Sequence, residues 1–253
     1  MKNDKPLISI ILPVHNCAEH LEECMKSLLS QSHKNIEILA IDDDSKDDSY
    51  KTLRLFAKRD KRLKVSRNVK RYGIGITLNR IIKKTKGSFI AFMDAEDVSM
   101  KDRLKKQLLY LKSNPQVVAV GTQCFFVGKN EKKLGKSKFP KENDNIYGSP
   151  HHGVSMQFET VMINKNLLPK DVLRFDTRSN PFMYSDLFLK LLPYGKFANL
   201  KNYLHYHRNH PKVYLKDLRR NLIQLIHLFI KSITFYNYSF SIRSFFAPII
   251  KSA

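Results

Sequence analysis

Short apolar runs alternate with amphipathic segments through the first hundred positions of the chain. Residues 7–12 (LISIIL) and 36–41 (IEILAI) are apolar runs rich in β-branched residues, the pattern of strands buried on both faces of a parallel sheet. Between them, over residues 18–30, apolar side chains recur at spacings of three and four, which predicts an amphipathic helix. The members of this stripe are Leu21, Cys24, Met25, Leu28 and Leu29.

The alternation of strand and helix then repeats. A loop at 42–48, a helix at 50–59, a strand at 63–66, a helix at 74–85 and a strand at 88–93 follow in turn. Such an order predicts an α/β fold with a Rossmann-like, mostly parallel sheet flanked by helices. Ligands of such sheets bind beyond the carboxyl ends of the strands.

The pattern changes after about residue 125. Residues 129–153 are polar and rich in turn residues, which predicts a loop. An extended stretch at 155–163 and a helix at 185–192 are expected beyond it, and a tail helix at about 215–233. We therefore divide the chain into a main domain over 1–212 and a C-terminal helical tail over 213–253.

Composition narrows the classes of protein. The 253 residues carry 45 Lys and Arg against 23 Asp and Glu, a net charge of +22 that attracts nucleic acid, anionic lipid or phosphorylated substrates, or simply covers a solvated surface. The three cysteines include no CxxC pair, which disfavours a disulfide framework and indicates a reducing compartment. No apolar run is long enough for a signal peptide core or a membrane span, so we expect a cytoplasmic protein, either free or peripheral on the inner face of a membrane.

Two acidic clusters directly follow predicted strands. Asp42, Asp43 and Asp44 concentrate negative charge in one loop, where carboxylates could accept hydrogen bonds from a nucleotide base and ribose; capping of the next helix explains only one of them. Asp94 and Glu96 follow a buried strand, and hard oxygen ligands at this spacing suit Mg²⁺ or Mn²⁺ bridging a diphosphate. A solvated acidic turn is the alternative for the second cluster.

The glycine-rich element at residues 73–75 does not match a dinucleotide fingerprint. The third glycine of GxGxxG would fall on Leu78, and the element precedes rather than follows the convincing strand. No GxxxxGK[ST] motif occurs either. Both observations disfavour a dehydrogenase and a P-loop NTPase.

Taken in order, these motifs resemble glycosyltransferase family 2, a family of inverting enzymes with the GT-A fold. The likeness covers about residues 6–211, and an ordered set of this kind is far more specific than one motif. It is carried by ISIILPVHN at 8–16, IDDDSKDD at 41–48, GSFIAFMDAEDVSMKDRLKKQ at 87–107, NPQVVAVGTQ at 114–123 and DLFLKLLPYGKFANL at 186–200.

The resemblance implies a hexosyl- or N-acetylhexosaminyltransferase that uses a nucleotide-sugar donor, commonly UDP-linked, and a glycan, lipid-linked or protein acceptor, as in polysaccharide biosynthesis. The nucleotide half would span about 1–125 and the acceptor half about 150–212. Asp94 and Glu96 would hold Mn²⁺ or Mg²⁺, with Glu96 in place of the usual second Asp. The implied donor-binding residues are Pro13, His15, Asn16, Asp42, Asp43, Asp94 and Ala95.

The expected catalytic base departs from the family pattern. Met183 and Tyr184 stand where the family has the Glu-Asp pair that accepts the acceptor's proton, and Asp186 comes two residues later. Two residues turn a helix by about 200°, so Asp186 would point to the opposite face unless the helix starts late. Asp186 is the candidate base, and Asp176 or Glu159 are alternatives that loops would have to bring in.

Other interpretations stay open. The loss of the Glu-Asp pair fits a nucleotide-sugar-binding protein without transferase activity, whereas the charge alone fits a nucleic-acid-binding protein; no helix-turn-helix, zinc-finger or RRM signature supports the latter, so no nucleic-acid partner is expected. A zinc site at His205, His207 and His210 is a minor alternative. The stretch 214–233 is basic and apolar, and predicts a helix that either lies on an anionic membrane surface or packs on the core.

Overall fold

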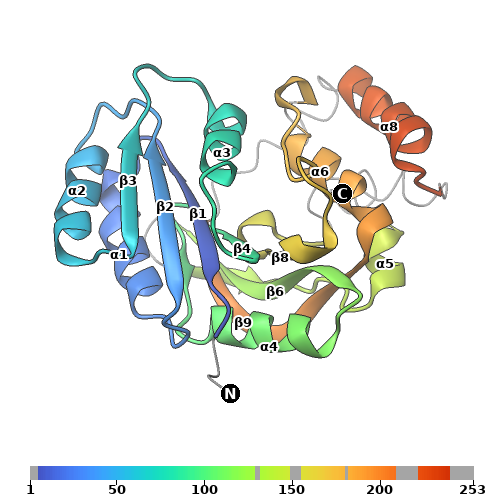
Figure 1. Ribbon diagram of the computed structural model, residues 1–253, viewed down its shortest axis with the longest axis horizontal. Coiled ribbons are helices and arrows are strands. Elements are labelled where there is room, and N and C mark those ends of the chain that lie inside the picture. Colours follow the sequence, from blue (N-terminus) through green and yellow to red (C-terminus); the bar gives the residue numbers. More distant parts are fainter. Residues whose placement is uncertain (1–4, 129–131, 149–154, 180–181, 209–221, 240–253) are drawn as a thin grey trace.

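The computed structural model describes residues 5–128, 132–148, 155–179, 182–208 and 222–239. One continuous sheet in the order β3-β2-β1-β4-β8-β6-β9-β5, with β7 paired to β6, forms its centre (Figure 1). The strands are β1 Ile8–Val14, β2 Ile36–Asp42, β3 Leu63–Arg67, β4 Phe89–Phe92, β5 Val98–Ser99, β6 Val117–Val127, β7 Lys133–Lys136, β8 Met162–Asn164 and β9 Lys196–Arg208. The α-helices are α1 Ala18–Leu29, α2 Ser49–Arg59, α3 Ile74–Ile82, α4 Arg103–Ser113, α5 Asn143–Tyr147, α6 Met183–Leu191 and α8 Leu222–Tyr236.

The first half of the chain forms the parallel part of the sheet, as the alternation predicts. β1 pairs in parallel with β2 and β4, and β2 pairs in parallel with β3. Side chains of β1 point alternately to two cores: Ile10 packs with α1, α2 and α4, and Ile11 packs with α3 and α6. Helices therefore cover both faces, which explains the unbroken apolar runs of these strands.

The second half is a mixed sheet that the apolar pattern did not predict. β8 is antiparallel to β4 and β6, while the long strands β6 and β9 pair in parallel with several register shifts. The prediction of an extended stretch at 155–163 is wrong for most of these residues. A 3₁₀ turn, Phe158–Thr160, occupies its middle, and strand β8 begins only at Met162.

The tail helix is present over the described residues Leu222–Tyr236, three residues beyond its expected end at 233. α8 packs on α6 through Leu225 and Leu228, which contact Phe182 and Leu189. The predicted start of the helix, at 215–221, lies outside the described residues. Among the helices that the structure describes, none is long and apolar enough to cross a membrane.

Candidate active site

A pocket of about 280 Å³ opens at the carboxyl ends of β1, β2 and β4. Val14 is level with Asp42 in the parallel register, and Ile11 is level with Phe92, so the segments that leave these strands converge. We call this cavity the acidic pocket. It is lined by Pro13, Val14, His15, Cys17, Asp43, Arg71, Gly73, Ile74, Thr77, Asp94 and Glu96.

Asp43 builds the wall of the acidic pocket at the start of α3. Its Oδ1 accepts hydrogen bonds from Asn68 Nδ2 at 2.6 Å and from the Tyr72 backbone N–H at 2.9 Å, and its Oδ2 accepts from the Gly73 N–H at 2.7 Å. Burial opposes the charge, but these bonds outweigh it and lower the pKa of Asp43. Gly73 has a φ of 86°, a left-handed conformation that favours glycine, and it lets the chain turn into α3.

Other members of the first acidic cluster serve the fold. Asp42 is fully buried and pairs with Arg67 Nε at 3.0 Å. Asp47 accepts the backbone N–H groups of Ala18 and Ser49, which ties the starts of α1 and α2 together. Asn16 accepts the backbone N–H of Lys46 rather than lining the acidic pocket.

The second acidic cluster forms a tight turn after β4. The Glu96 N–H donates to Asp94 Oδ1 at 2.9 Å, and the buried Ala95 between them packs in the core. Burial, together with the nearby carboxylates of Asp97 and Glu159, raises the pKa of Asp94 to about 7. The turn after β4 therefore places several carboxylates close together.

Asp97 differs from its neighbours because it is fully paired. His205 Nε2 and His207 Nδ1 lie 2.8 Å and 2.9 Å from its Oδ2, and the Arg208 N–H donates to its Oδ1. These three side chains could converge on a metal ion. In the absence of a metal, the charge and hydrogen bond of Asp97 outweigh the effect of burial and raise the pKa of His207 to about 9. The group connects the turn after β4 to β9. His210, the third histidine of the predicted zinc site, lies outside the described residues.

A narrow recess continues from the acidic pocket between β4 and α6. It shares Pro13, Ile74 and Asp94 with that pocket, and Glu159 and Tyr184 add to its wall. Tyr184 stacks on Phe158 with ring centroids 4.1 Å apart, and Gln157 Nε2 donates to Glu159 Oε2 at 2.6 Å. The 3₁₀ turn thus brings a carboxylate next to Asp94.

The structure does not bring Asp186 to this recess. α6 begins at Met183, and Tyr184 faces the recess. Asp186 follows two residues later and lies on the other side of the helix, as expected from a rotation of about 200°. Asp186 is fully buried, and its Oδ1 accepts bonds from Lys231 Nζ at 2.6 Å and Tyr236 OH at 3.0 Å. This carboxylate anchors α8, and its burial excludes contact with an acceptor. Asp176 lies in the same contact, 3.0 Å from Lys231.

Four predicted donor-binding residues and both predicted metal ligands line the acidic pocket, whereas Asn16, Asp42 and Ala95 do not. Their binding roles stay predictions. Sequence reasoning missed Arg71, whose side chain lines the pocket, and gave no role to Gly73. The sequence signal for Gly73 was its position, after a short strand and directly before an amphipathic helix.

Two solved structures in complex with nucleotides or nucleotide sugars have the same fold. S. aureus TarS in complex with UDP has a TM-score of 0.65 and 19% identity, over 87% of this chain and 65% of that chain. Mannosyltransferase PcManGT from Pyrobaculum calidifontis, in complex with GDP-Man and Mn²⁺, has a TM-score of 0.68 and 18% identity, over 99% and 69% of the two chains. At these identities the likeness shows the fold, which confirms the expected GT-A architecture.

Curated relatives are named as glycosyltransferases. An uncharacterized glycosyltransferase of Haemophilus influenzae is 37% identical over 120 residues, 47% of this chain and 48% of that protein. TuaG of Bacillus subtilis, whose name assigns it to teichuronic acid biosynthesis, is 34% identical over 44% of each chain. The alignments thus span about half the length of these relatives. Residues 9–167, more than half of the chain, match the family described as "Glycosyl transferase family 2", and this chain belongs to that family.

Proposed function

We propose that this chain transfers a sugar from a nucleotide-sugar donor, with UDP as the first choice of nucleotide, to an acceptor hydroxyl with inversion at the anomeric carbon. The observation that carries the proposal is the convergence of His15, Asp43, Asp94 and Glu96 in one pocket at the carboxyl edge of the sheet. Complexes of TarS with UDP and of PcManGT with GDP-Man support a nucleotide donor.

Asp94 and Glu96 would hold Mn²⁺ or Mg²⁺. The carboxylate ligands fit, because these ions prefer carboxylate oxygens. Burial and the nearby carboxylates of Asp97 and Glu159 raise the pKa of Asp94, and a bound cation would offset both effects. A bound cation would neutralise the charge of the departing diphosphate. The Mn²⁺ in the PcManGT complex supports this choice.

Glu159 is the base we propose. It lies beside Asp94 in the recess, and the hydrogen bond from Gln157 orients its carboxylate. As the acceptor oxygen bonds to the anomeric carbon, its proton passes to Glu159 and the nucleoside diphosphate leaves with the electrons of the broken C–O bond. Tyr184 supplies the apolar wall of the recess, which limits water at the reacting centre.

Binding of UDP tests the donor and metal sites. Glu96→Gln should weaken UDP binding about tenfold in Mn²⁺ and change little in EDTA, because only the metal-dependent contact is lost. Glu142→Gln, an exposed carboxylate in another part of the chain, is the matched control. Equal UDP affinities of the Glu96→Gln variant and the parent in Mn²⁺ would contradict the proposed metal site.

A nucleotide-sugar-binding protein without transferase activity is the second candidate, and Met183 and Tyr184 favour it. Donor hydrolysis and transfer assays on the full chain separate the two. UDP binding without turnover of any nucleotide sugar would support the binding protein.

The acceptor is proposed to be a hydroxyl of a surface glycan or of its lipid-linked precursor. The name of TuaG is the support for polysaccharide synthesis. The identity of the transferred hexose or N-acetylhexosamine would follow from competition among UDP-sugars in the same assay.

We further propose that α8 rests on an anionic membrane surface. Five of the eleven exposed large apolar side chains in the described residues lie on this one helix: Ile223, Ile226, Ile230, Ile233 and Phe235. Ile223, Ile226, Ile230 and Ile233 form a stripe opposite Leu225 and Leu228, which pack on α6. Phe235 lies on the Leu228 side of the helix, where both line one cavity. From Leu187 to Ala253 the sequence has eleven Lys and Arg and one acidic residue, Asp217, a charge balance that suits anionic lipid.

Sedimentation with anionic vesicles tests this contact. Ile223→Ser with Ile230→Ser should reduce the bound fraction several-fold, since each change removes apolar area of the stripe. Leu55→Ser, which alters an exposed leucine on α2, should not. Substitution is preferable to truncation, because removing α8 would leave Asp186 buried without Lys231. Unchanged sedimentation of the double variant would refute the contact.

A further inference from the structure

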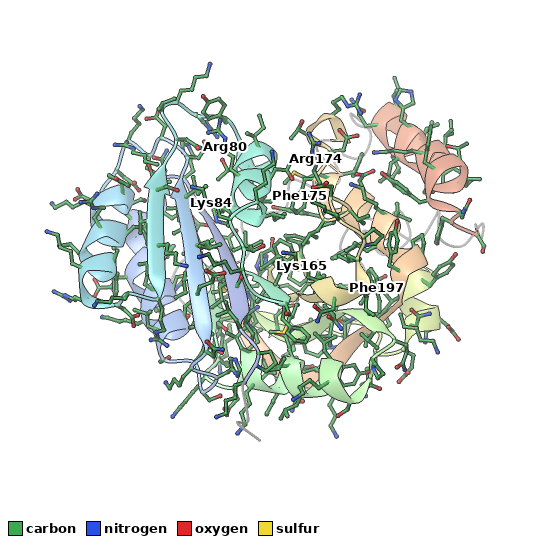
Figure 2. All side chains as sticks on the ribbon, viewed as in Figure 1. Arg80, Lys84, Lys165, Arg174, Phe175 and Phe197 are labelled. Carbon is green, nitrogen blue, oxygen red and sulfur yellow. The ribbon has the colours of Figure 1, made fainter. Side chains whose placement is uncertain are left out.

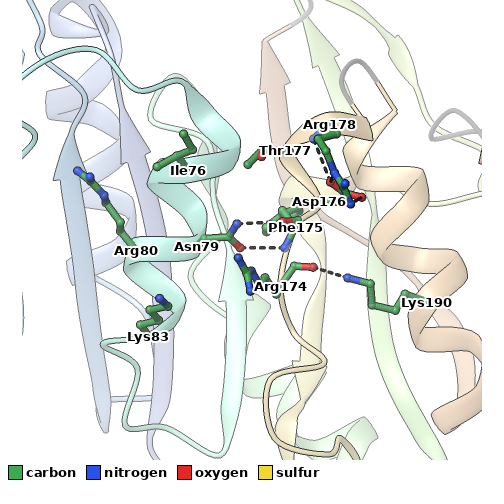
Figure 3. A pocket seen from close by; sticks show the side chains of 10 residues that line it. All are labelled: Ile76, Asn79, Arg80, Lys83, Arg174, Phe175, Asp176, Thr177, Arg178 and Lys190. Carbon is green, nitrogen blue, oxygen red and sulfur yellow. Dashed lines mark hydrogen bonds and ion pairs between the residues drawn. The ribbon is translucent and has the colours of Figure 1, made fainter. Parts of the chain in front are cut away.

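A second cavity, of about 550 Å³, lies between α3 and the segment 174–178 (Figure 3). Asn79 on α3 spans the gap: its Nδ2 donates to the Phe175 carbonyl at 2.9 Å and its Oδ1 accepts the Phe175 N–H at 2.8 Å. These two bonds hold the walls of the cavity at a set separation. Its charged lining residues are Arg80, Lys83, Arg174, Asp176, Arg178 and Lys190, and we call the cavity the basic groove.

The basic groove is separate from the acidic pocket. Ile74 and Thr77 of α3 line the acidic pocket, while Ile76 and Asn79 line the groove. Figure 2 shows Arg174 and Phe175 on the side of α3 that faces α6. A donor bound in the acidic pocket therefore leaves the groove open for another ligand.

The positive charge of the groove is poorly compensated. Its one carboxylate, Asp176, is shared between Arg178 and Lys231, at 3.1 Å and 3.0 Å. Lys190 donates to the Arg174 backbone carbonyl, and Arg80 donates to the neutral amide of Asn68. In the described part of the chain, Arg80, Lys83, Arg174 and Lys190 form no ion pair with a carboxylate.

Lys190 is in an unfavourable position for a charged amine. Burial is the largest cause that lowers its pKa; Lys231 and Arg174 lower it further, while the carboxylates of Asp186 and Asp176 oppose the shift. An anion in the groove would relieve both the repulsion and the desolvation cost. Phosphate is the anion best suited to several convergent Lys and Arg donors.

An apolar surface continues from the basic groove along α8. An adjoining cavity of about 690 Å³ shares Asp176, Arg178 and Lys190 with the groove, and Leu228, Phe235 and Tyr236 line its other side. Phe235 is 78% exposed. Cationic donors at one end and aromatic and aliphatic side chains at the other match an amphiphile with a phosphate head.

We propose that the basic groove binds the phosphate of a lipid-linked acceptor, with the hydrocarbon chain running along α8 toward the membrane. The inference deepens the proposed function and rests on it for the identity of the ligand as an acceptor. An apolar wall next to the cations favours a lipid phosphate over a nucleic acid, whose successive phosphates need an extended basic track.

Calorimetric titration of the full chain with octyl phosphate tests the proposal. Octyl phosphate should bind more tightly than inorganic phosphate, because the chain buries apolar area along α8, and octyl glucoside should bind weakly because it lacks the charge. The Lys83→Gln/Arg174→Gln double variant removes two exposed cations and should weaken octyl phosphate binding about tenfold. Lys84→Gln is the matched control, since Lys84 donates to Ser66 on the β3 side of α3 (Figure 2).

Titration with UDP and Mn²⁺ distinguishes this proposal from the proposed function. The double variant should bind UDP like the parent, because neither residue lines the acidic pocket. Equal octyl phosphate affinities of the parent and the double variant would overturn the groove while leaving the donor site intact. Inorganic phosphate binding as tightly as octyl phosphate would overturn the lipid assignment.

Discussion

The carboxylates of the acidic pocket and those of the α6–α8 contact have opposite surroundings. Asp94 in the pocket and Glu159 in the adjoining recess have no ion pair with Lys or Arg among the described residues, and the pKa of Asp94 is raised to about 7. In the contact, Lys231 lies between Asp176 and Asp186, and hydrogen bonds outweigh burial and lower the pKa of Asp176. In this protein, a carboxylate that is paired with a cation stabilises the fold, whereas neighbouring carboxylates without such a partner are candidates for catalysis or metal binding.

The largest effect should come from Glu159→Gln. Loss of the proposed base should lower kcat for transfer about 10³-fold, the usual range for general base catalysis, while UDP affinity stays within about twofold. Stopped assays of sugar transfer and a UDP titration measure the two quantities. Full transfer activity of the Glu159→Gln variant would contradict the proposed catalytic role of this carboxylate.

Asp186→Asn should act on stability instead. The change weakens the bond to Lys231, and we expect a loss of about 2 kcal/mol in the free energy of unfolding, discounted because Lys231 is partly exposed. Urea unfolding measures it, and kcat of the folded variant should change little. A large drop in kcat without destabilisation would restore Asp186 as the base.

His207 should make stability depend on pH above neutrality. The charge and hydrogen bond of Asp97 outweigh burial and raise its pKa to about 9, above the unfolded value of about 6.5. The stabilisation is complete below pH 6.5 and is lost as pH rises through 9, because the unfolded chain releases its proton first. Unfolding between pH 6 and 9.5 should show a decline of about 2 kcal/mol that His207→Gln flattens. The same slope in the variant would assign the dependence to another group.

The smallest effect separates two aspartates of the first acidic cluster. Asp43→Asn should weaken UDP binding about fivefold, because the Tyr72 and Gly73 N–H groups lose a charged acceptor next to the pocket. Asp47→Asn alters a link between α1 and α2 and should have less effect on UDP affinity. Greater sensitivity at Asp47 would move the nucleotide base away from Asp43.

The parallel half of the fold and the position of the acidic pocket followed from the sequence because local patterns determine them. Apolar runs with buried faces predicted β1 and β2, and the acidic residues after strands marked the carboxyl edge. The mixed half was missed because β6 and β9 include polar residues such as Gln123 and Asn199, whose hydrogen bonds are long-range.

The surroundings of the candidate base could not be predicted from the sequence for a similar reason. Helical rotation already indicated that Asp186 and Tyr184 face opposite ways, but nothing local showed which face meets the pocket. Glu159 reaches Asp94 only because β4 pairs with β8, a contact between segments some seventy residues apart. Lys231, the partner of Asp186, lies 45 residues further along the chain, which is also too far for a local pattern to indicate the contact.

The three hydrogen bonds that Asp43 accepts from Asn68, Tyr72 and Gly73 also bear on the speed of binding. These bonds fix the conformation of the turn before α3, so this wall of the acidic pocket is already ordered before a ligand binds. The conformational entropy of that turn is lost during folding and not again on association. Nucleotide capture should therefore follow one bimolecular phase whose rate rises linearly with ligand concentration, without a slow isomerisation.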